Sequence, residues 1–299
     1  MTENPHSSPT AQEDLVSDLK LADALRVNDI PPCPRILQSI ASEMRKEAPD
    51  MKMLAAQIGS DVALSASLLL LANSALYRRR QPVHSVQDAI NWLGLSTIAS
   101  AIAALQLKRL LPPGLQMERF WDTSAHVARL SAWLAERLGR SVGCKPDEAF
   151  TFGLFRDCGI PILLVRYPYY AATLTRANET RDRPFTDVEE DEFPTNHAVA
   201  GSLLSEGWWL PEKISLAIRH HHARAALTAR SPLRNGEPEL IAIAQLAEYL
   251  WQQISGLSKN FEWEKLGELC LARLKLDEAA LPELIEEARR LLGSEPTIL

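Results

Sequence analysis

Residues 85–107 read SVQDAINWLGLSTIASAIAALQL, and they carry the clearest local signals of secondary structure in the chain. Ser85 with Asp88 three positions later resembles a capping box at a helix start, and Gly94 suits a helix C-terminus. Ser96 begins a second run, in which apolar residues recur at helical spacing. The stretch therefore predicts two consecutive helices, each with an apolar face.

The same stretch is where the chain comes closest to a membrane-spanning segment. From Ala89 to Leu107 it carries no charged residue, close to the ~20 apolar residues that cross a bilayer. It also contains polar or flexible residues, namely Asn91, Gly94, Ser96, Thr97, Ser100 and Gln106. We therefore expect a buried core segment and a protein that does not contact membranes.

Helical patterns continue in both directions, and alternating strand-like patterns bounded by turn residues are absent. We therefore predict an all-α fold.

The strongest internal break is Leu-Pro-Pro-Gly at residues 111–114, which separates a helical module at 16–111 from a second one at 115–299. The polar residues 1–15 are expected to form a loose N-terminal segment. Because apolar helix faces on both sides of the break need cover, we expect the two modules to pack as one rigid unit.

Within the second module, residues 176–186 form a polar stretch that we expect to be a loop. Thr186 and Glu189 after it have the spacing of a capping box, which predicts the start of another helix.

The composition is that of an ordinary soluble protein. With 299 residues, 46% hydrophobic and 23% charged, the chain is neither disordered nor collagen-like. Its net charge of -6 gives no overall attraction to nucleic acid or anionic membranes. The N-terminus lacks the basic and apolar runs of a secretory signal. We expect a cytoplasmic protein with four reduced, non-catalytic thiols, at Cys33, Cys144, Cys158 and Cys270.

Histidines gather in the second module. Imidazole is the commonest metal-ligand side chain in proteins. A single histidine on a helix is more often a hydrogen-bonded core or surface residue than a metal ligand. A run such as His220 to His222 could simply end a helix, where positive charge is favourable. Their order is more informative, because it alternates with carboxylates. The series is His126, Arg156-Asp157, His197, His221-His222 and Glu248. It resembles the metal-ligand series of the HD superfamily of metal-dependent phosphohydrolases, whose ligands lie inside a helical bundle.

Motifs in both modules narrow this resemblance. They are PPCP at 31–34, IGSDVAL at 58–64, LANSA at 71–75, SVQDAI at 85–90, GLFRDCG at 153–159 and WLP at 209–211. In this order they resemble the HDOD family, the HD-related output domain of bacterial signalling proteins, over about residues 28–255. The resemblance implies a non-catalytic bacterial regulator. It implies signalling proteins as partners that are bound in trans, because no receiver, kinase or cyclase domain is recognisable.

The departures from the HD pattern concern the metal ligands. Arg156 stands where the HD pair has its histidine, Glu248 stands where the distal aspartate is expected, and no Gly-Tyr-Pro follows His221-His222. A guanidinium offers no lone pair and repels a cation. We therefore expect Arg156 to pair with Asp157. The resemblance then implies a vestigial HD pocket without catalytic residues, metal or cofactor, lined by His126, Arg156, Asp157, His197, His221, His222 and Glu248.

Other functions remain alternatives at this point. The strongest is a metal-dependent phosphohydrolase that uses His126, Asp157, His197, His221 and His222. A small ligand or nucleotide in the degenerate pocket is a further possibility, although the chain has no phosphate-binding loop of the GxGxxG or GxxxxGK[ST] type. A DNA-binding regulator is weaker, because no charged recognition helix stands out. We do not expect nucleic acid as a partner.

Overall fold

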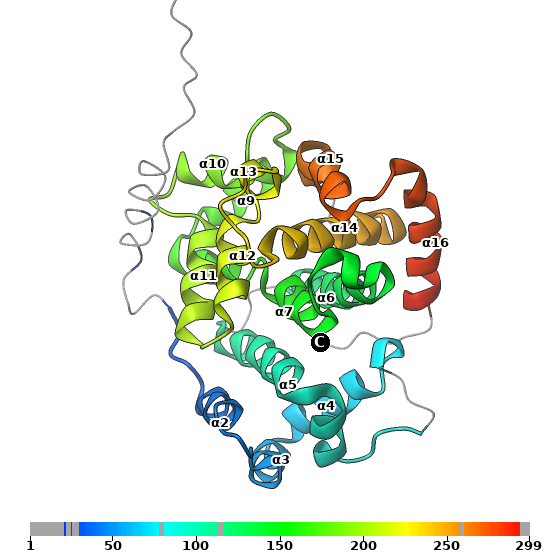
Figure 1. Ribbon diagram of the computed structural model, residues 1–299. Helices are drawn as coiled ribbons and strands as arrows, with labels where there is room; N and C mark the ends of the chain where they lie inside the picture. The colour runs from blue at the N-terminus through cyan, green and yellow to red at the C-terminus, as the bar shows by residue number, and fades with distance from the viewer. Residues whose placement is uncertain are drawn as a thin grey trace, which may run out of the picture.

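The computed structural model describes residues 21, 25, 30–77, 81–112, 117–257 and 260–293. In these ranges the chain forms helices and no strands, so the all-α prediction is confirmed (Figure 1). The expected loose segment at 1–15 lies outside the described residues. Residues 113 and 114 of the Leu-Pro-Pro-Gly break also lie outside them.

The N-terminal module lies at the bottom of Figure 1. Its helices are α2 (Arg35–Met44), α3 (Met51–Gly59), α4 (Val62–Ala72), the short 3-10 helix η2 (Ala75–Tyr77) and α5 (Val86–Leu110). Ser85 caps α5 as predicted, because its side chain accepts a hydrogen bond from the Asp88 backbone N–H. Gly94 interrupts α5 with a φ of 79°, which explains why the sequence predicts two helices here.

The second module contains the remaining helices, arranged around α6, α7 and α14. They are α6 (Glu118–Leu138), η3 (Gly139–Val142), α7 (Pro146–Phe155), α8 (Gly159–Arg166), α9 (Tyr170–Glu179), α10 (Phe185–Glu190), α11 (His197–Gly207), α12 (Glu212–His220), α13 (Arg224–Leu227), α14 (Glu237–Ser255), α15 (Glu262–Leu274), η4 (Glu278–Ala280) and α16 (Leu281–Leu292). α6, α7 and α14 pack against one another, and α11 packs against both α8 and α12 (Figure 1).

One continuous hydrophobic core joins the two modules. α5 packs against α2, α3 and α4 on one side and against α7 on the other. Two polar contacts also cross the junction: Ser100 Oγ lies 2.7 Å from Thr151 Oγ1, and the Trp208 indole donates to the Pro31 carbonyl over 2.8 Å. By length and composition α5 could cross a membrane, but 56% of its most apolar window is buried in the fold. Its contacts on both sides are those of a core helix.

Two local expectations in the second module are wrong. The polar stretch at 176–186 is helical at its start, because α9 continues to Glu179, and at its end, because α10 begins at Phe185. Thr186 is not a helix cap, since Pro184 occupies the cap position. Glu189 is fully buried, and its carboxylate forms hydrogen bonds with Tyr170 and His197 inside the core of the module.

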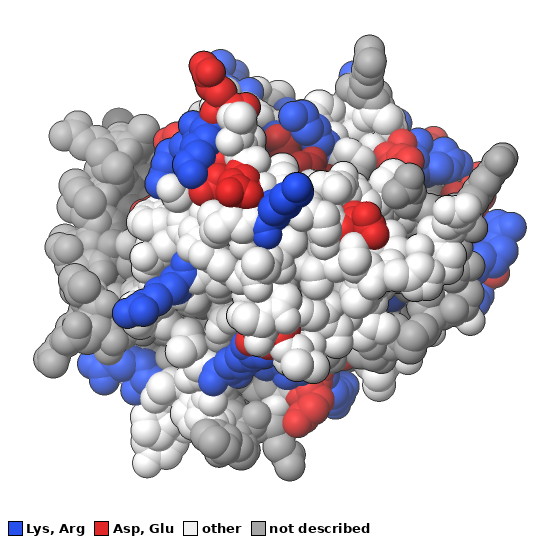
Figure 2. All heavy atoms as spheres, turned by 90° about the horizontal axis from the view of Figure 1, so that it is seen from below, with Lys and Arg blue, Asp and Glu red and all other residues white. Residues whose placement is uncertain are grey.

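The outer face of the N-terminal module carries few charges. Figure 2 views the molecule from this side and shows a broad uncharged area with charged side chains mainly around it. α4 contributes to this face and contains no charged residue. Its Val62 side chain is 82% exposed and its Leu70 side chain 49% exposed. An exposed apolar helix face of this kind is typical of a protein-interaction surface.

Candidate functional site

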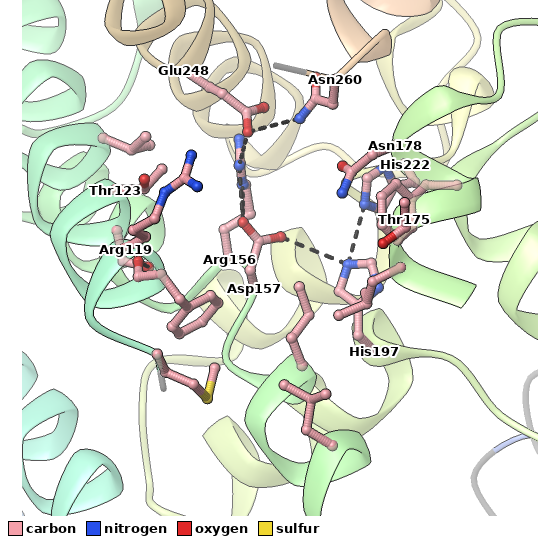
Figure 3. A pocket seen from close by; sticks show the side chains of 18 of the residues that line it. Arg119, Thr123, Arg156, Asp157, Thr175, Asn178, His197, His222, Glu248 and Asn260 are labelled. Carbon is pink, nitrogen blue, oxygen red and sulfur yellow. Dashed lines mark hydrogen bonds and ion pairs between the residues drawn. The ribbon is translucent and has the colours of Figure 1, made fainter. Parts of the chain in front are cut away.

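Four segments of the second module bring ionisable side chains to one cavity of about 610 Å³. Arg156 and Asp157 follow the end of α7, His197 begins α11, and Glu248 lies within α14. The fourth segment follows α12, where His221 and His222 lie. These side chains form two groups that share Asp157, which we call the Arg156 side and the imidazole side. Figure 3 shows the arrangement, with Glu248 above Arg156 and Asp157 and with His197 and His222 beside them.

A glycine allows the close approach of two of these segments. A Cβ atom on Gly159 would lie 2.0 Å from the carbonyl oxygen of His197 and 2.7 Å from the backbone nitrogen of Gly201. Only a residue without a side chain lets α8 meet α11 at this distance. Gly159 therefore helps to place His197 beside Asp157.

The Arg156 side is a buried network of ion pairs. Arg156 is 5% exposed, and its Nη2 atom lies 2.9 Å from Asp157 Oδ2 and 2.9 Å from Glu248 Oε1. Asn260 donates a further hydrogen bond to Glu248 Oε1 over 3.0 Å (Figure 3). Burial alone would raise the pKa of Asp157, but the Arg156 charge outweighs burial and holds this pKa well below its usual value. The predicted Arg156–Asp157 pair is confirmed, and Glu248 completes it.

The imidazole side begins at the other oxygen of the same carboxylate. Asp157 Oδ1 lies 3.3 Å from His221 Nε2 and 3.6 Å from His197 Nε2. His197 Nε2 lies 3.2 Å from His221 Nε2 and 3.1 Å from His222 Nε2. Three imidazoles therefore direct the same ring nitrogen toward one point.

The opposite ring nitrogen of each imidazole has its own acceptor. His197 Nδ1 bonds to Glu189 Oε2 over 2.7 Å, and His222 Nδ1 bonds to Glu262 Oε2 over 2.6 Å. His221 Nδ1 bonds to the Ile218 carbonyl over 2.7 Å. Because carbonyl and ionised carboxylate oxygens can only accept, each Nδ1 carries the hydrogen. The Nε2 lone pairs consequently face one another, which requires a shared cation or proton between them.

Burial and charge distinguish the three imidazoles. Burial lowers the pKa of His221, and burial with the neighbouring His221 lowers the pKa of His222 to about 3. Burial also acts to lower the pKa of His197, but the Glu189 carboxylate outweighs it, so this pKa is raised. His221 and His222 are therefore neutral near neutral pH, and His197 takes the proton when no other cation is present.

His126 does not join either side, and its predicted place in the pocket is wrong. Its ring stacks on Trp251 with 3.8 Å between centroids, and its Nδ1 atom bonds to the Asp122 carbonyl over 2.7 Å. α6 instead directs Thr123 and Val127 toward the cavity. The sequence series identifies the helix but not its rotation, and one position along a helix turns a side chain by about 100°, as 3.6 residues per turn requires.

Two residues of the site are absent from the sequence prediction. Glu189 has the spacing of a capping residue, and Glu262 is one of many acidic residues near the C-terminus. Each becomes recognisable only when the fold places it against a histidine Nδ1 atom. Burial raises the pKa of Glu262, but its His222 contact outweighs this and lowers the pKa to about 2, so Glu262 stays ionised.

The two sides differ in their fitness for a metal ion. The HD pattern implies ligands from His126, the Arg156 position, Asp157 and Glu248, and these residues do not fit: one lies elsewhere and one has no lone pair. The imidazole side does fit. Asp157, His197, His221 and His222 each offer one ligand atom, and the four atoms lie within 4.8 Å of one another.

The rest of the cavity lining contains both polar and apolar residues. Arg119, Thr123, Thr175, Asn178 and Asn260 provide polar groups around it (Figure 3). Its size and lining suit a small polar ligand.

Comparison with known proteins relates the chain to one family. The HDOD domain model matches residues 30–224. A candidate phosphohydrolase from Shewanella amazonensis SB2B has a similar crystal structure, with a TM-score of 0.65 and 22% identity over 93% of this chain and 94% of that one. An HDOD domain protein of unknown function from Geobacter sulfurreducens gives a TM-score of 0.61 and 22% identity over 95% and 99% of the two chains. At these identities the likeness shows the fold.

Among curated proteins, an uncharacterized protein of Treponema pallidum (strain Nichols) is 26% identical over 208 residues. The aligned part is 68% of this chain but only 40% of that protein. The chain thus spans less than half the length of this relative.

Proposed function

The chain belongs to the HDOD domain family, and from this premise we propose that it is a non-enzymatic signal-transduction protein that acts by binding separate signalling proteins. Its HD pocket serves as a binding and structural element, where a small ligand or nucleotide could enter the cavity.

The ion pairs of Arg156 carry this proposal. An HD phosphohydrolase needs a metal ion at the position that the guanidinium now occupies, because the metal polarises the phosphate and activates water. At about 4 Å, and with an effective dielectric constant near 20, two unit charges repel by about 4 kcal/mol, and a divalent ion doubles this. Because each 1.4 kcal/mol is about a tenfold change in affinity, a metal on the Arg156 side would bind several orders of magnitude more weakly.

The uncharged face of α4 supports a role in protein binding. Val62 and Leu70 expose apolar side chains on a helix that contains no charged residue. Because a matched residue is available in the second module, this surface can be tested directly. Leu70→Glu should abolish co-purification of partner proteins, whereas Leu257→Glu should not, although both leucines are 49% exposed. Equal partner recovery by the two variants would count against α4 as the partner surface.

We also propose that the thiols are unreactive and that the protein works in the reducing cytoplasm. Burial raises the pKa of Cys144 to about 12 and that of Cys270 to about 12, so neither forms the nucleophilic thiolate readily. Titration of the native protein with a thiol reagent should label these two residues slowly, and rapid labelling of Cys270 would contradict the proposal.

A metal-dependent phosphohydrolase is the second candidate. It is favoured by the imidazole side, where four potential ligand atoms converge, and by the likeness to the Shewanella structure. One experiment distinguishes the two proposed functions. The purified protein, supplied with Mn²⁺, Fe²⁺ or Zn²⁺, should not hydrolyse bis-p-nitrophenyl phosphate, p-nitrophenyl phosphate or cyclic dinucleotides above the metal-only control. Hydrolysis that disappears in the Asp157→Asn variant would establish the enzyme instead.

A further inference from the structure

α3 and α4 form a bent helix pair that carries almost no charge. Their axes meet at 117°, and residues 51–77 contain only two charged side chains, Lys52 and Asp61. This pair belongs to the face of the N-terminal module that Figure 2 shows as a broad uncharged area. The only polar residues of α4 are Ser65 and Ser67. A helix that is apolar on all sides is normally covered on all sides, but one side of α4 is open.

The open side of α4 has a definite shape. Val62, Ala66 and Leu70 follow one another at intervals of four residues, so they form one row along the helix, and all three are exposed. Val62 and Leu70 project at the two ends of the row, about 12 Å apart along the helix axis for eight residues. Ala66 leaves a gap between them. Side chains of a second helix interlock with a ridge of this kind.

The charges around this face are mostly positive. α3 and the second half of α5, residues 95–110, both belong to helices that pack on α4, and their charged residues are Lys52, Lys108 and Arg109. The turn between α3 and α4 adds one anion, Asp61, to which Arg109 donates two hydrogen bonds over 2.6 and 3.0 Å. Three cations against one anion leave a net charge of +2 around the face, in a chain whose net charge is -6.

We propose that this face binds a helix of a partner protein, and that this helix carries an apolar stripe between acidic side chains. This binding mode rests on the proposed function and specifies the kind of partner that α4 receives. A large apolar side chain of the partner would lie over Ala66, between Val62 and Leu70, because a small residue at this position lets two helices approach closely. The acidic side chains beside the stripe would face Lys52 and Lys108, which steers the encounter and selects the partner.

A lipid bilayer and a second copy of the chain fit this face less well than an acidic helix does. Helices that lie on membranes present a broad apolar face beside many Lys and Arg side chains, whereas α4 has no charged residue and exposes two large apolar side chains, Val62 and Leu70. In a symmetric dimer the same patch of both copies meets, so Lys52 and Lys108 of one copy would approach the like charges of the other. The charge around the face therefore favours a partner of opposite sign.

The test uses the full-length protein and fluorescein-labelled helical peptides of about 18 residues, long enough for a helix to form in water. The peptides share one stripe of leucines and carry either glutamate or lysine beside it. In fluorescence anisotropy the glutamate peptide should bind about tenfold more tightly than the lysine peptide. This preference should shrink at higher salt, because ions screen exposed charges. A glutamate peptide with the same composition but scrambled leucines should lose its binding.

Substitutions separate the contribution of packing from that of charge. Ala66→Leu fills the gap in the row and should weaken binding of the glutamate peptide about tenfold, as overpacking does. Ala66→Ser keeps the residue small and should bind this peptide almost like the unmodified chain. Lys108→Glu should weaken the glutamate peptide and strengthen the lysine peptide. Arg234→Glu is the matched control, because Arg234 is an exposed cation of the second module, and it should change neither affinity.

Equal affinities for the glutamate and lysine peptides, or binding that Ala66→Leu leaves unchanged, would overturn the inference. Flotation with phosphatidylcholine–phosphatidylglycerol vesicles that Leu70→Glu prevents would assign the face to a bilayer instead. A dimer in analytical ultracentrifugation that Leu70→Glu dissociates would assign it to a second copy. If the peptides fail to bind but partner proteins still co-purify through Leu70, only the kind of partner is wrong. Loss of both results would refute the proposed function as well.

Discussion

The Arg156 side and the imidazole side use the two oxygens of a single carboxylate in opposite ways. Asp157 Oδ2 accepts from a permanently charged guanidinium, while Oδ1 faces three imidazole nitrogens that share no fixed cation. On the first side the positive charge is covalently part of the chain, and on the second side it must come from outside. Loss of the HD histidine has therefore closed one half of the pocket and left ligand geometry intact in the other half.

The largest expected effect comes from giving the Arg156 side a ligand again. Arg156→His removes the fixed charge and supplies a lone pair next to Asp157 and Glu248. Because the charge alone costs several orders of magnitude in affinity at this distance, metal content measured by mass spectrometry should rise above that of the unmodified chain. Arg119→His is the control, since Arg119 lines the same cavity but is exposed. An unchanged metal content in Arg156→His would show that Arg156 is not what closes this side.

Removal of the guanidinium without replacement should be costly to stability. Arg156→Ala leaves Asp157 and Glu248 close together without their shared cation, and unpaired buried charges of this kind cost about 3–5 kcal/mol. Urea denaturation measures this free energy of unfolding. A loss below about 1 kcal/mol would mean that the ion pairs contribute no more than an exposed salt bridge does.

A methyl group at Gly159 should disturb the imidazole side without touching its ligands. In Gly159→Ala the new Cβ would overlap the His197 carbonyl, so α8 and α11 must separate. Overpacking of this kind costs roughly 1–3 kcal/mol. Urea denaturation measures this loss of free energy of unfolding. Gly207→Ala, where no neighbouring atom lies within 4 Å of the added Cβ, should leave the free energy of unfolding nearly unchanged. Equal stabilities of the two variants would contradict the role given to Gly159.

The smallest effect is expected at His126, outside both sides. His126→Ala removes the stacked contact with Trp251, and aromatic pairs contribute about 0.5–1.5 kcal/mol beyond the area they bury. Denaturant unfolding should register a loss of this size. A loss as large as that of Arg156→Ala would show that His126 contributes to the buried network and would weaken the division into two sides.

The sequence predicts the fold and most of the pocket, and its errors have identifiable causes. The capping signals at Ser85 and the helical spacing of apolar residues are local, so they survive folding unchanged. The Arg156–Asp157 pair is also local, because the two residues are adjacent. By contrast, the position of His126 depends on how α6 is rotated against α14, and periodicity alone does not fix that rotation.

Glu189 shows the complementary difficulty. Its spacing from Thr186 is that of a cap, but the folded chain uses its carboxylate for Tyr170 and His197. A contact between segments cannot be read from the spacing within one segment. The convergence of three Nε2 atoms is of the same kind, since it depends on where α11 and the end of α12 meet.

A crystal of the full-length protein soaked in Zn²⁺ tests most directly whether Arg156 closes its side of the pocket to a metal ion. Anomalous scattering at the zinc absorption edge locates zinc independently of any model of the ligands. We predict no peak within bonding distance, roughly 2.0–2.2 Å, of Glu248, with Arg156 still paired to Asp157 and Glu248. A peak beside Glu248 on the Arg156 side would contradict the account.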